Sequence, residues 1–265
     1  MLKTEMRNEA STHIDCMDTL SIMQLMNREN MNAVKAVEGA LDRIAETCDA
    51  VAACFENGGR LFYIGAGTSG RLGVIDAAEC PPTFGVPRGQ VIGIIAGGEK
   101  CMSQAAEKEE DDAEAGVRDL QKYDFCERDI LIGISASGGA AYVIGAMKYA
   151  SSLGAVTASL CSNADSPMER VADIAIVVDT GAEVITGSTR LKSGTAQKLV
   201  LNMISTGAMV RTGKVYENMM INLRPTNIKL RGRMIRIVCE ILGCDAETAE
   251  SRLEASGWNI RDAVE

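Results

Sequence analysis

Hydrophobic residues recur three or four positions apart over residues 19–57, which is the spacing of one face of an amphipathic helix. Gly58 and Gly59 follow, and glycine commonly ends a helix. The first 18 residues are polar and show no such period. We therefore expect an irregular start and then a helical stretch from about Thr19 to Asn57.

The pattern then changes to short apolar runs, rich in Ile and Val, that do not alternate with polar residues. Strands covered on both faces have this pattern. Helical stretches separate the runs, and strand alternating with helix predicts a parallel, doubly wound sheet of about five strands. The runs lie at 60–65, 91–97, 130–135, 155–161 and 174–179, and the helices are expected at 69–79, about 101–121, 139–152 and near 166–171.

The remaining chain is expected to be helical. A polar loop at 181–198 leads into a helix that continues to about Val210, and short helices are predicted after about Asn227, with breaks at Gly243 and Gly257. We expect three parts: an N-terminal helical segment packed on the sheet domain (1–57), the sheet domain itself (58–225) and a small helical appendage (226–265), for which truncation stays open.

Composition and net charge limit the classes of partner that the protein is expected to bind. Hydrophobic residues make up 46% and charged residues 24%, which is ordinary for a globular protein. The net charge of -9 argues against nucleic acid or an anionic membrane as the main partner. A small anionic ligand stays possible, because backbone N–H groups can bind it. No apolar run approaches the roughly 20 residues of a membrane helix.

The cysteines indicate a reducing compartment. There are nine cysteines without a C-x-x-C pair and a single histidine, His13, so a zinc site has few ligands to draw on. The polar start lacks the apolar core of a secretory signal. We expect reduced thiols, no metal and a cytoplasmic location.

The segment GAGTSG at 65–70 follows a predicted strand and opens a helix. Its glycines allow close backbone approach, its helix start offers N–H groups to an anion, and Thr68 and Ser69 add hydroxyls. Taken literally it is the dinucleotide fingerprint, but that needs an acidic residue about 20 positions on. The second strand here ends some 30 positions on, which favours a phosphate monoester; a structural tight turn stays open.

A second such loop, SASG at 135–138, follows the third predicted strand. Loops at the carboxyl ends of parallel strands converge where such sheets bind ligands, at the switch point of the strand order. Ser137 and Gly138 are therefore expected to bind a ligand in the same way as the first loop. The alternative is that Ser137 only caps a helix.

Acidic side chains supply candidate acid–base groups. Glu79, in DAAECPPTFG, is expected at the end of a helix just before a Pro-Pro turn, where the helix dipole disfavours an anion. It is either functional or a solvated surface residue. In the acidic cluster EKEEDD at 107–112, mutual repulsion raises a pKa, as a general base requires, although most such runs are solvated faces. The sequence pattern alone singles out no member of this cluster.

The loop GSTRLKSGTAQK at 187–198 combines hydroxyls and cations before a helix, which suits a phosphate or sugar. Together with GAGTSGRLG and DAAECPPT, it resembles the N-acetylmuramic acid 6-phosphate etherase family, and the similarity runs over nearly the whole chain. Part of it is shared with the glucokinase regulatory protein, a related sugar-phosphate binder without enzymatic activity.

The resemblance implies a phosphosugar isomerase-type (SIS) αβα sandwich that works as a homodimer with sites near the subunit interface and uses no cofactor. It implies a carbon–oxygen lyase of cell-wall recycling that converts N-acetylmuramic acid 6-phosphate to N-acetylglucosamine 6-phosphate and D-lactate. The family's acid–base glutamates fall on Glu79 and Glu110, and we take Glu110 as base and Glu79 as acid. Substrate binding is expected of Gly67, Thr68, Ser69, Ser137, Gly138, Glu183, Ser188, Thr189 and Lys192.

One departure from the family pattern matters. The family usually has Arg-Thr-Pro after Ser137 and Gly138, whereas this chain has Gly139-Ala140-Ala141, which removes a cation and a hydroxyl. Phosphate affinity or anchoring of the lactyl carboxylate is expected to be weaker. The rival functions are a non-catalytic sugar-phosphate regulator, an aldose–ketose phosphate isomerase and, more distantly, a nicotinamide dehydrogenase.

Overall fold

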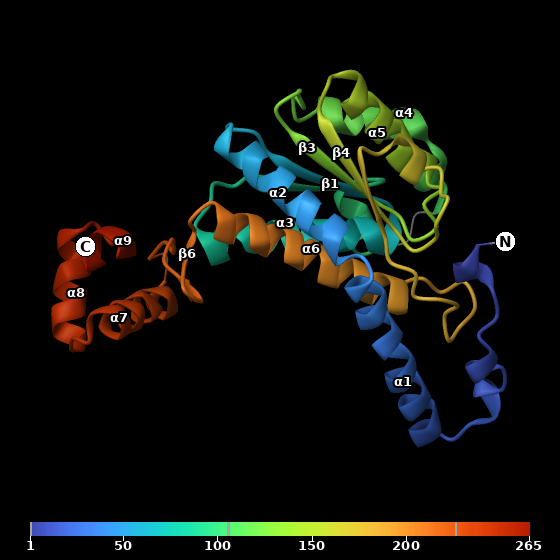
Figure 1. The fold of residues 1–265 in the computed structure, drawn as a ribbon, viewed down its shortest axis with the longest axis horizontal. Helices are drawn as coiled ribbons and strands as arrows, with labels where there is room; N and C mark the ends of the chain where they lie inside the picture. Colours follow the sequence, from blue (N-terminus) through green and yellow to red (C-terminus); the bar gives the residue numbers. More distant parts are fainter. Residues whose placement is uncertain (1, 105–106, 226) are drawn as a thin grey trace.

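A five-stranded sheet forms the centre of the molecule (Figure 1). The computed structural model describes residues 2–104, 107–225 and 227–265. All neighbouring strands are parallel, in the order β2-β1-β3-β4-β5, which confirms the predicted doubly wound sheet. The strand order reverses between β1 and β3, so the switch point lies at their carboxyl ends. The strands are β1 (Leu61–Gly65), β2 (Val91–Ile95), β3 (Ile130–Ile134), β4 (Val156–Cys161) and β5 (Ile174–Val177).

Helices cover both faces of this sheet, which explains why its strands are apolar without alternation. Tyr63 and Ile132 face one hydrophobic cluster, whereas Phe62 and Leu131 face the other. The first cluster contains α2 (Leu41–Glu56), α3 (Gly67–Phe84) and α6 (Lys192–Arg211); the second contains α4 (Ala113–Gln121) and α5 (Ala141–Ser152).

The predicted N-terminal helical stretch is divided by a break into two helices. The break falls at Gly39 and Ala40, between α1 (Thr19–Glu38) and α2. Glycine lowers helix propensity, and Ala40 leaves the helical region with φ at -113°. The break lets α1 project from the body of the molecule while α2 stays on the sheet (Figure 1). Three 3-10 turns precede α1: η1 (Lys3–Glu5), η2 (Glu9–Ser11) and η3 (Ile14–Cys16).

Helix α3 is longer than predicted and does not end at a Pro-Pro turn. It runs through Pro81 and Pro82 to Phe84 and ends where Gly85 adopts a left-handed conformation. Burial of Cys80 and Phe84 against the sheet maintains the helix despite the prolines. A side chain at position 85 is excluded, because its Cβ would lie 1.6 Å from the carbonyl oxygen of Asn222.

The expected helix at 101–121 is also different. The structure has two 3-10 turns, η4 (Glu99–Met102) and η5 (Glu107–Asp111), before α4, whose N-cap is Asp112. The carboxylate of Asp112 accepts a hydrogen bond from the Ala115 N–H, which fixes the helix start after the acidic cluster. The expected helix near 166–171 is a single turn, η6 (Glu169–Val171).

The chain after α6 forms a small unit with its own hydrophobic core. A short hairpin, β6 (Val215–Tyr216) and β7 (Met219–Met220), leads to three helices that lie to one side of the sheet domain (Figure 1). These are α7 (Ile228–Leu242), α8 (Ala246–Ala255) and α9 (Ile260–Val264), with breaks at the two predicted glycines. In the described part of the chain, no helix is both long and apolar enough to cross a bilayer.

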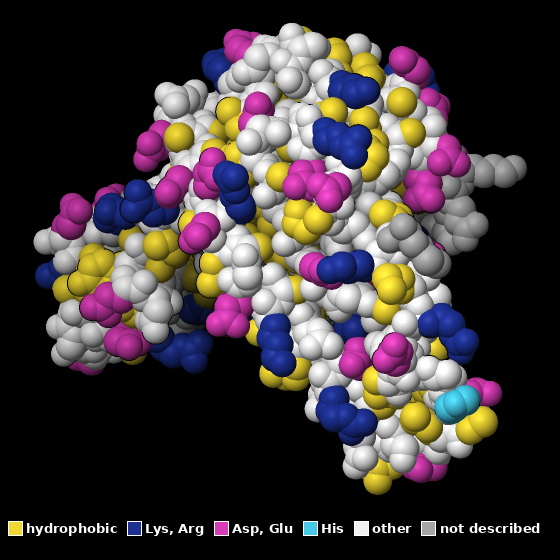
Figure 2. Space-filling view, turned by 45° about the vertical axis from the view of Figure 1, so that its right-hand side comes forward, with side chains coloured by type: hydrophobic (Ala, Val, Ile, Leu, Met, Phe, Trp, Pro, Cys, Tyr) yellow, Lys and Arg dark blue, Asp and Glu magenta, His cyan; other side chains and the backbone are white. Residues whose placement is uncertain are grey.

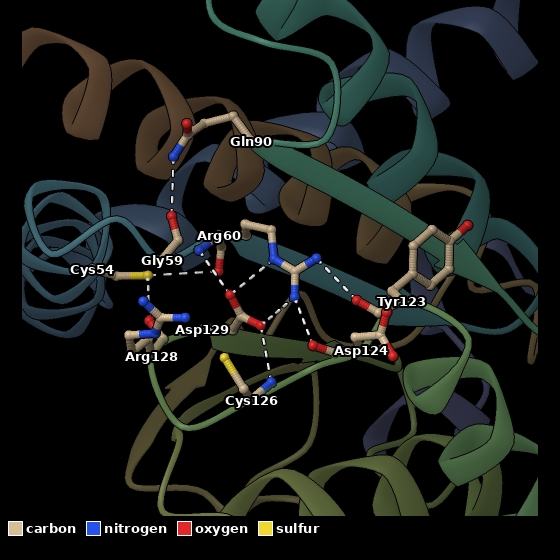
Figure 3. A network of polar contacts seen from close by, with 9 residues as sticks. All are labelled: Cys54, Gly59, Arg60, Gln90, Tyr123, Asp124, Cys126, Arg128 and Asp129. Atoms are coloured by element: carbon tan, nitrogen blue, oxygen red, sulfur yellow. Dashed lines mark hydrogen bonds and ion pairs between the residues drawn. The ribbon is translucent and has the colours of Figure 1, made fainter.

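The amino ends of β1 and β3 are joined by a closed polar network (Figure 3). The guanidinium of Arg60 donates to both carboxylate oxygens of Asp129 and to the carbonyl oxygens of Tyr123 and Asp124. Asp129 also accepts from the backbone N–H groups of Arg60 and Cys126. Desolvation alone raises the pKa of Asp129, but these hydrogen bonds outweigh it and hold the pKa below its ordinary value.

Candidate functional site

The loop after β1 is folded tightly against the strand that precedes it. A Cβ on Gly70 would lie 2.5 Å from the Gly65 carbonyl oxygen, so α3 approaches β1 more closely than any side chain permits. Gly67 adopts a φ of +52°, and no atom lies within 4 Å of the position its Cβ would take, which leaves open space above the start of α3. The buried Ser69 hydroxyl donates to the Gln197 side-chain oxygen on α6.

The loop after β3 lies at the same sheet edge. Ser135 and Ser137 approach each other with their hydroxyl oxygens 3.3 Å apart, and the N–H of Gly139 donates to the Ser137 hydroxyl. The N-cap of α5 is Ala140, without a side-chain cap, so Ser137 does not cap that helix. Gly138 has a φ of +71° and packs against Ser166 of the next loop.

A third loop, after β4, belongs to this edge, and the sequence analysis missed it. Ser162 and Asn163 directly follow the apolar strand and are buried. The Ser162 hydroxyl has no hydrogen-bond partner among the described residues, and the Asn163 amide donates to the Ala136 carbonyl oxygen and to the Thr4 hydroxyl. The polar residues after an apolar run are the signal that identified the other two loops, and it applies here too.

The start of α6 also lies at this edge of the sheet. Both carboxylate oxygens of Glu183 accept backbone hydrogen bonds, from Lys192 at 3.1 Å and from Ser193 at 2.9 Å, so Glu183 caps this helix from a distance in sequence. The Lys192 side chain is only 2% exposed, and its amine donates to Glu29 of α1 at 2.6 Å. The half-buried hydroxyls of Ser188 and Thr189 make no hydrogen bond within the described residues.

The polar N-terminal segment lies over this edge instead of being free. The backbone N–H of Thr4 donates to the Asn163 side chain, and Asn8 donates to Glu29 and to the Ala182 carbonyl oxygen. Desolvation raises the pKa of Glu29, but hydrogen bonds from Lys192 and Asn8 outweigh it and lower this pKa overall. The ion pair between Lys3 and Asp179 adds a further contact to the loop after β5.

Glu110 lies at the carboxyl edge, within η5. This turn packs against α5, and Glu109 beside it lies close to Gly97, just after β2. Arg71 of α3 donates to the carbonyl oxygens of Met102 and Gln104, which ties the segment before η5 to the first loop's helix. The structure thus brings the segment that carries Glu110 to the edge formed by the three loops.

Glu79 does not lie near these loops within one chain. It is exposed and follows Gly67 by 12 residues of continuous α3, a rise of about 18 Å at 1.5 Å per residue. The neighbouring Cys80 is buried, and burial raises the pKa of its thiol to about 12, so it is no thiolate nucleophile at neutral pH. Glu79 and Glu110 therefore occupy different parts of the single chain.

A shallow hollow of about 290 Å³ adjoins the first loop. It is lined by Thr68, Leu72, Arg190, Gly194, Thr195 and Lys198, and so by two cations and no acidic residue. Neither Arg190 nor Lys198 makes an ion pair with another described residue. A larger cavity of about 550 Å³ lies at the opposite sheet edge, against the C-terminal unit, and is lined by residues such as Val86, Gln90 and Trp258. Because it is remote from the three loops, we place the site at the hollow and the loops.

Comparison with known sequence families identifies the sheet domain. Residues 43–151 match the glucokinase regulatory protein N-terminal SIS domain, and residues 113–206 match the SIS domain. These matches agree with the observed sheet order and confirm the expected fold class.

Solved structures share this fold at low sequence identity. A phosphoheptose isomerase from Neisseria gonorrhoeae is 16% identical, with a TM-score of 0.54, over 72% of this chain and 98% of that one. The NanR protein of Vibrio vulnificus complexed with ManNAc-6P is 15% identical, with a TM-score of 0.52, over 76% of this chain and 67% of that one. At this level of identity, the similarity shows the fold alone.

Curated relatives are far more similar. The chain is 51% identical over 261 residues to the N-acetylmuramic acid 6-phosphate etherase of Aeromonas hydrophila subsp. hydrophila, covering 98% of this chain and 88% of the relative. The etherase of Edwardsiella ictaluri is 52% identical over 263 residues, covering 99% and 88%. This protein therefore belongs to the N-acetylmuramic acid 6-phosphate etherase family.

Proposed function

We propose that this protein cleaves the lactyl ether of N-acetylmuramic acid 6-phosphate and releases N-acetylglucosamine 6-phosphate and D-lactate. The observation that carries the proposal is about 50% identity to named etherases over nearly the full chain. The loop geometry supports it, because neutral donors at helix starts suit a phosphate monoester.

The reaction is an elimination followed by addition of water. In the open-chain sugar, the aldehyde acidifies the C2 proton, and the Glu110 carboxylate removes it. The C3–O bond then breaks, and the Glu79 carboxylic acid protonates the departing lactate oxygen. Water adds at C3 of the resulting alkene, and a proton returns to C2, which restores both glutamates.

The neutral loops bind the phosphosugar. Backbone N–H groups and hydroxyls at the starts of α3 and α5 hold the phosphate, and the loop before α6 contacts the sugar. Glu183 and Lys192 act by fixing the start of α6, since their polar atoms already pair with the chain. The phosphate and sugar ligands are Gly67, Thr68, Ser69, Ser137, Gly138, Ser188 and Thr189.

The substrate carries a second anion, the lactyl carboxylate, and this chain has Gly139 where the family usually has arginine. Arg190 and Lys198 provide unpaired positive charge in the hollow beside Thr68. We expect them to hold the lactyl carboxylate, next to the phosphate on the loops.

The protein acts as a cytoplasmic homodimer, with a small sugar phosphate rather than nucleic acid or membrane as its ligand. Large apolar side chains are exposed on one layer of the molecule: Met23, Met31 and Val34 on α1, Ile75 on α3, and Met203 and Val210 on α6. Figure 2 shows hydrophobic side chains at the surface of the projecting arm. Such clustering is typical of surfaces covered by a partner.

The test is lactate release from N-acetylmuramic acid 6-phosphate by the purified protein, measured with lactate dehydrogenase. Glu110→Ala is expected to lower kcat by about 10²–10⁴. Glu79→Gln is expected to retain exchange of the C2 proton with deuterium from solvent, followed by NMR, while it releases no lactate. Binding of the substrate without turnover by the wild type would contradict an etherase and favour the non-catalytic regulator.

A further inference from the structure

A cavity of about 550 Å³ lies where the sheet domain meets the C-terminal unit, at the sheet edge opposite the three loops. Its wall on the sheet-domain side includes Phe55, Val86 and Met209, which belong to the core of that domain or pack against it. Its other wall includes Leu223 and Trp258, which belong to the core of the C-terminal unit or pack against it. Ligand pockets occur preferentially between two such parts, and this volume suits a small organic molecule.

Direct contacts between the two parts fix the shape of this cavity. The Asn222 amide donates to the Phe84 carbonyl oxygen at 2.6 Å, and a Cβ on Gly85 would lie 1.6 Å from the carbonyl oxygen of Asn222. The Arg261 guanidinium donates to the Gly213 carbonyl oxygen at 2.8 Å. These contacts lie at or next to residues of the cavity wall, so the cavity is formed before a ligand binds.

Trp258, the only tryptophan of the chain, lies at this wall in an unusual backbone conformation. Its φ is +63°, in the left-handed region that residues other than glycine rarely adopt. Its N–H donates to the Leu253 carbonyl oxygen at 2.6 Å, and the Arg231 guanidinium lies 5.0 Å from the centre of its ring. Costly conformations persist where the surrounding structure maintains them, and they cluster at ligand sites. The Trp258 ring is therefore a candidate contact for a bound molecule.

The charged side chains of the cavity favour an anion. Lys214 and Arg224 line it, and neither makes an ion pair with another described residue. Glu56 is the only acidic residue among the described residues of the lining. Arg224 also lines an adjoining groove, where Arg88 adds positive charge and no described residue of the lining is acidic. An organic anion with a flat apolar body matches both the unpaired cations and the aromatic and aliphatic walls.

We propose that this cavity binds a small aromatic carboxylic acid as a second ligand, separate from the sugar phosphate. The ring of the ligand packs against Trp258 and Phe55, and its carboxylate accepts hydrogen bonds from Arg224 and Lys214. Helix α6 separates this site from the loops, because its 20 residues span about 30 Å and only its far end reaches the cavity. The proposal goes beyond the etherase reaction and does not depend on it.

Titration with 2-naphthoate, followed by fluorine NMR of protein labelled with 5-fluorotryptophan, tests the proposal. Because the chain has a single tryptophan, the spectrum contains one signal, and that signal reports on the cavity. We expect a saturable shift with a Kd on the order of 1 mM or tighter, the range for a ligand of about a dozen heavy atoms. The neutral analogue 2-naphthamide is expected to bind at least about tenfold more weakly. N-acetylglucosamine 6-phosphate should not displace 2-naphthoate.

Two variants test the cations. Arg224→Gln and Lys214→Gln each remove one charge from the lining and are expected to raise the Kd of 2-naphthoate about tenfold. Lys148→Gln is the matched control, because Lys148 is an exposed cation on α5, which packs on the other face of the sheet. The control should leave the Kd unchanged, and all three variants should unfold in urea at the wild-type midpoint.

The absence of a saturable shift up to about 10 mM 2-naphthoate overturns the proposal. Equal affinity for 2-naphthamide, or an unchanged Kd in both cation variants, overturns the assignment of an anionic ligand. Displacement of 2-naphthoate by N-acetylglucosamine 6-phosphate overturns the separation of the two sites. Absence of lactate release by the wild type contradicts the proposed etherase function instead and leaves these outcomes unaffected.

Discussion

The two edges of the sheet differ in whether their buried polar groups have hydrogen-bond partners. At the amino edge, Arg60 and Asp129 satisfy each other and the surrounding backbone (Figure 3). At the carboxyl edge, the buried Ser162 hydroxyl and the Gln197 amide nitrogen have no partner in the described part of the chain. A closed network stabilises the fold, whereas a buried donor without a partner lowers stability unless a water or a ligand satisfies it. The contrast indicates which edge serves stability and which serves binding.

The largest expected effect is on stability, at the amino edge. Asp129→Ala removes a carboxylate that is 2% exposed and leaves a guanidinium and two backbone N–H groups without their acceptor. We expect the free energy of unfolding in urea to fall by about 3 kcal/mol. The KM of the remaining folded enzyme should be unchanged. If KM rose by a factor that corresponds to the loss of unfolding free energy, the amino edge would also contribute to binding. That result would contradict the division between the edges.

The control for this variant is Asp49→Ala, because Asp49 pairs with Arg211 on the exposed surface. Its removal is expected to change the free energy of unfolding by no more than about 0.5 kcal/mol.

A smaller effect, on binding, is expected at the carboxyl edge. Ser137→Ala removes a hydroxyl that, among the described residues, forms hydrogen bonds only with Ser135 and the N–H of Gly139. A hydrogen bond to a charged ligand contributes about 1.5 kcal/mol or more, so the KM for the sugar phosphate should rise about tenfold. The unfolding free energy should change by less than about 1 kcal/mol. Ser152→Ala, at the far end of α5, should alter neither quantity, and an unchanged KM for Ser137→Ala would remove this loop from the site.

The smallest effect concerns acid stability. The pKa of Asp129 is lowered in the folded protein, so the folded state binds fewer protons than the unfolded state near an unfolded pKa of about 3.9. The stability contributed by this group is complete above that value and is lost as pH falls through the folded pKa. The difference in unfolding free energy between wild type and Asp129→Ala should therefore shrink below about pH 4.

Urea titrations at several pH values measure this difference. The difference in unfolding free energy between wild type and Glu29→Gln, at the carboxyl edge, should also shrink in acid, because the pKa of Glu29 is lowered as well. A gap for Asp129→Ala that widens in acid would be inconsistent with a depressed pKa.

Most of the sheet was predictable because each buried strand is a short apolar run bounded by polar residues. Helix ends were less predictable where tertiary packing opposes a local rule: burial of Cys80 and Phe84 carries α3 through two prolines that locally predict its end. The loop after β4 was predictable from Ser162 and Asn163 but was overlooked. The contact of Thr4 with Asn163 spans 159 positions, and no local pattern encodes it.

Because α3 is continuous, the number of residues between Gly67 and Glu79 fixes both the distance and the angle between them. Deleting one residue from this interval would shorten it by about 1.5 Å and turn Glu79 by about 100° about the helix axis. Substitutions on the solvent side of the same interval would leave both dimensions intact. In a helix held by close packing at Gly70 and by the hydrogen bonds of Asp76, the number of residues sets the distance between the two ends, whereas the identity of the exposed side chains does not.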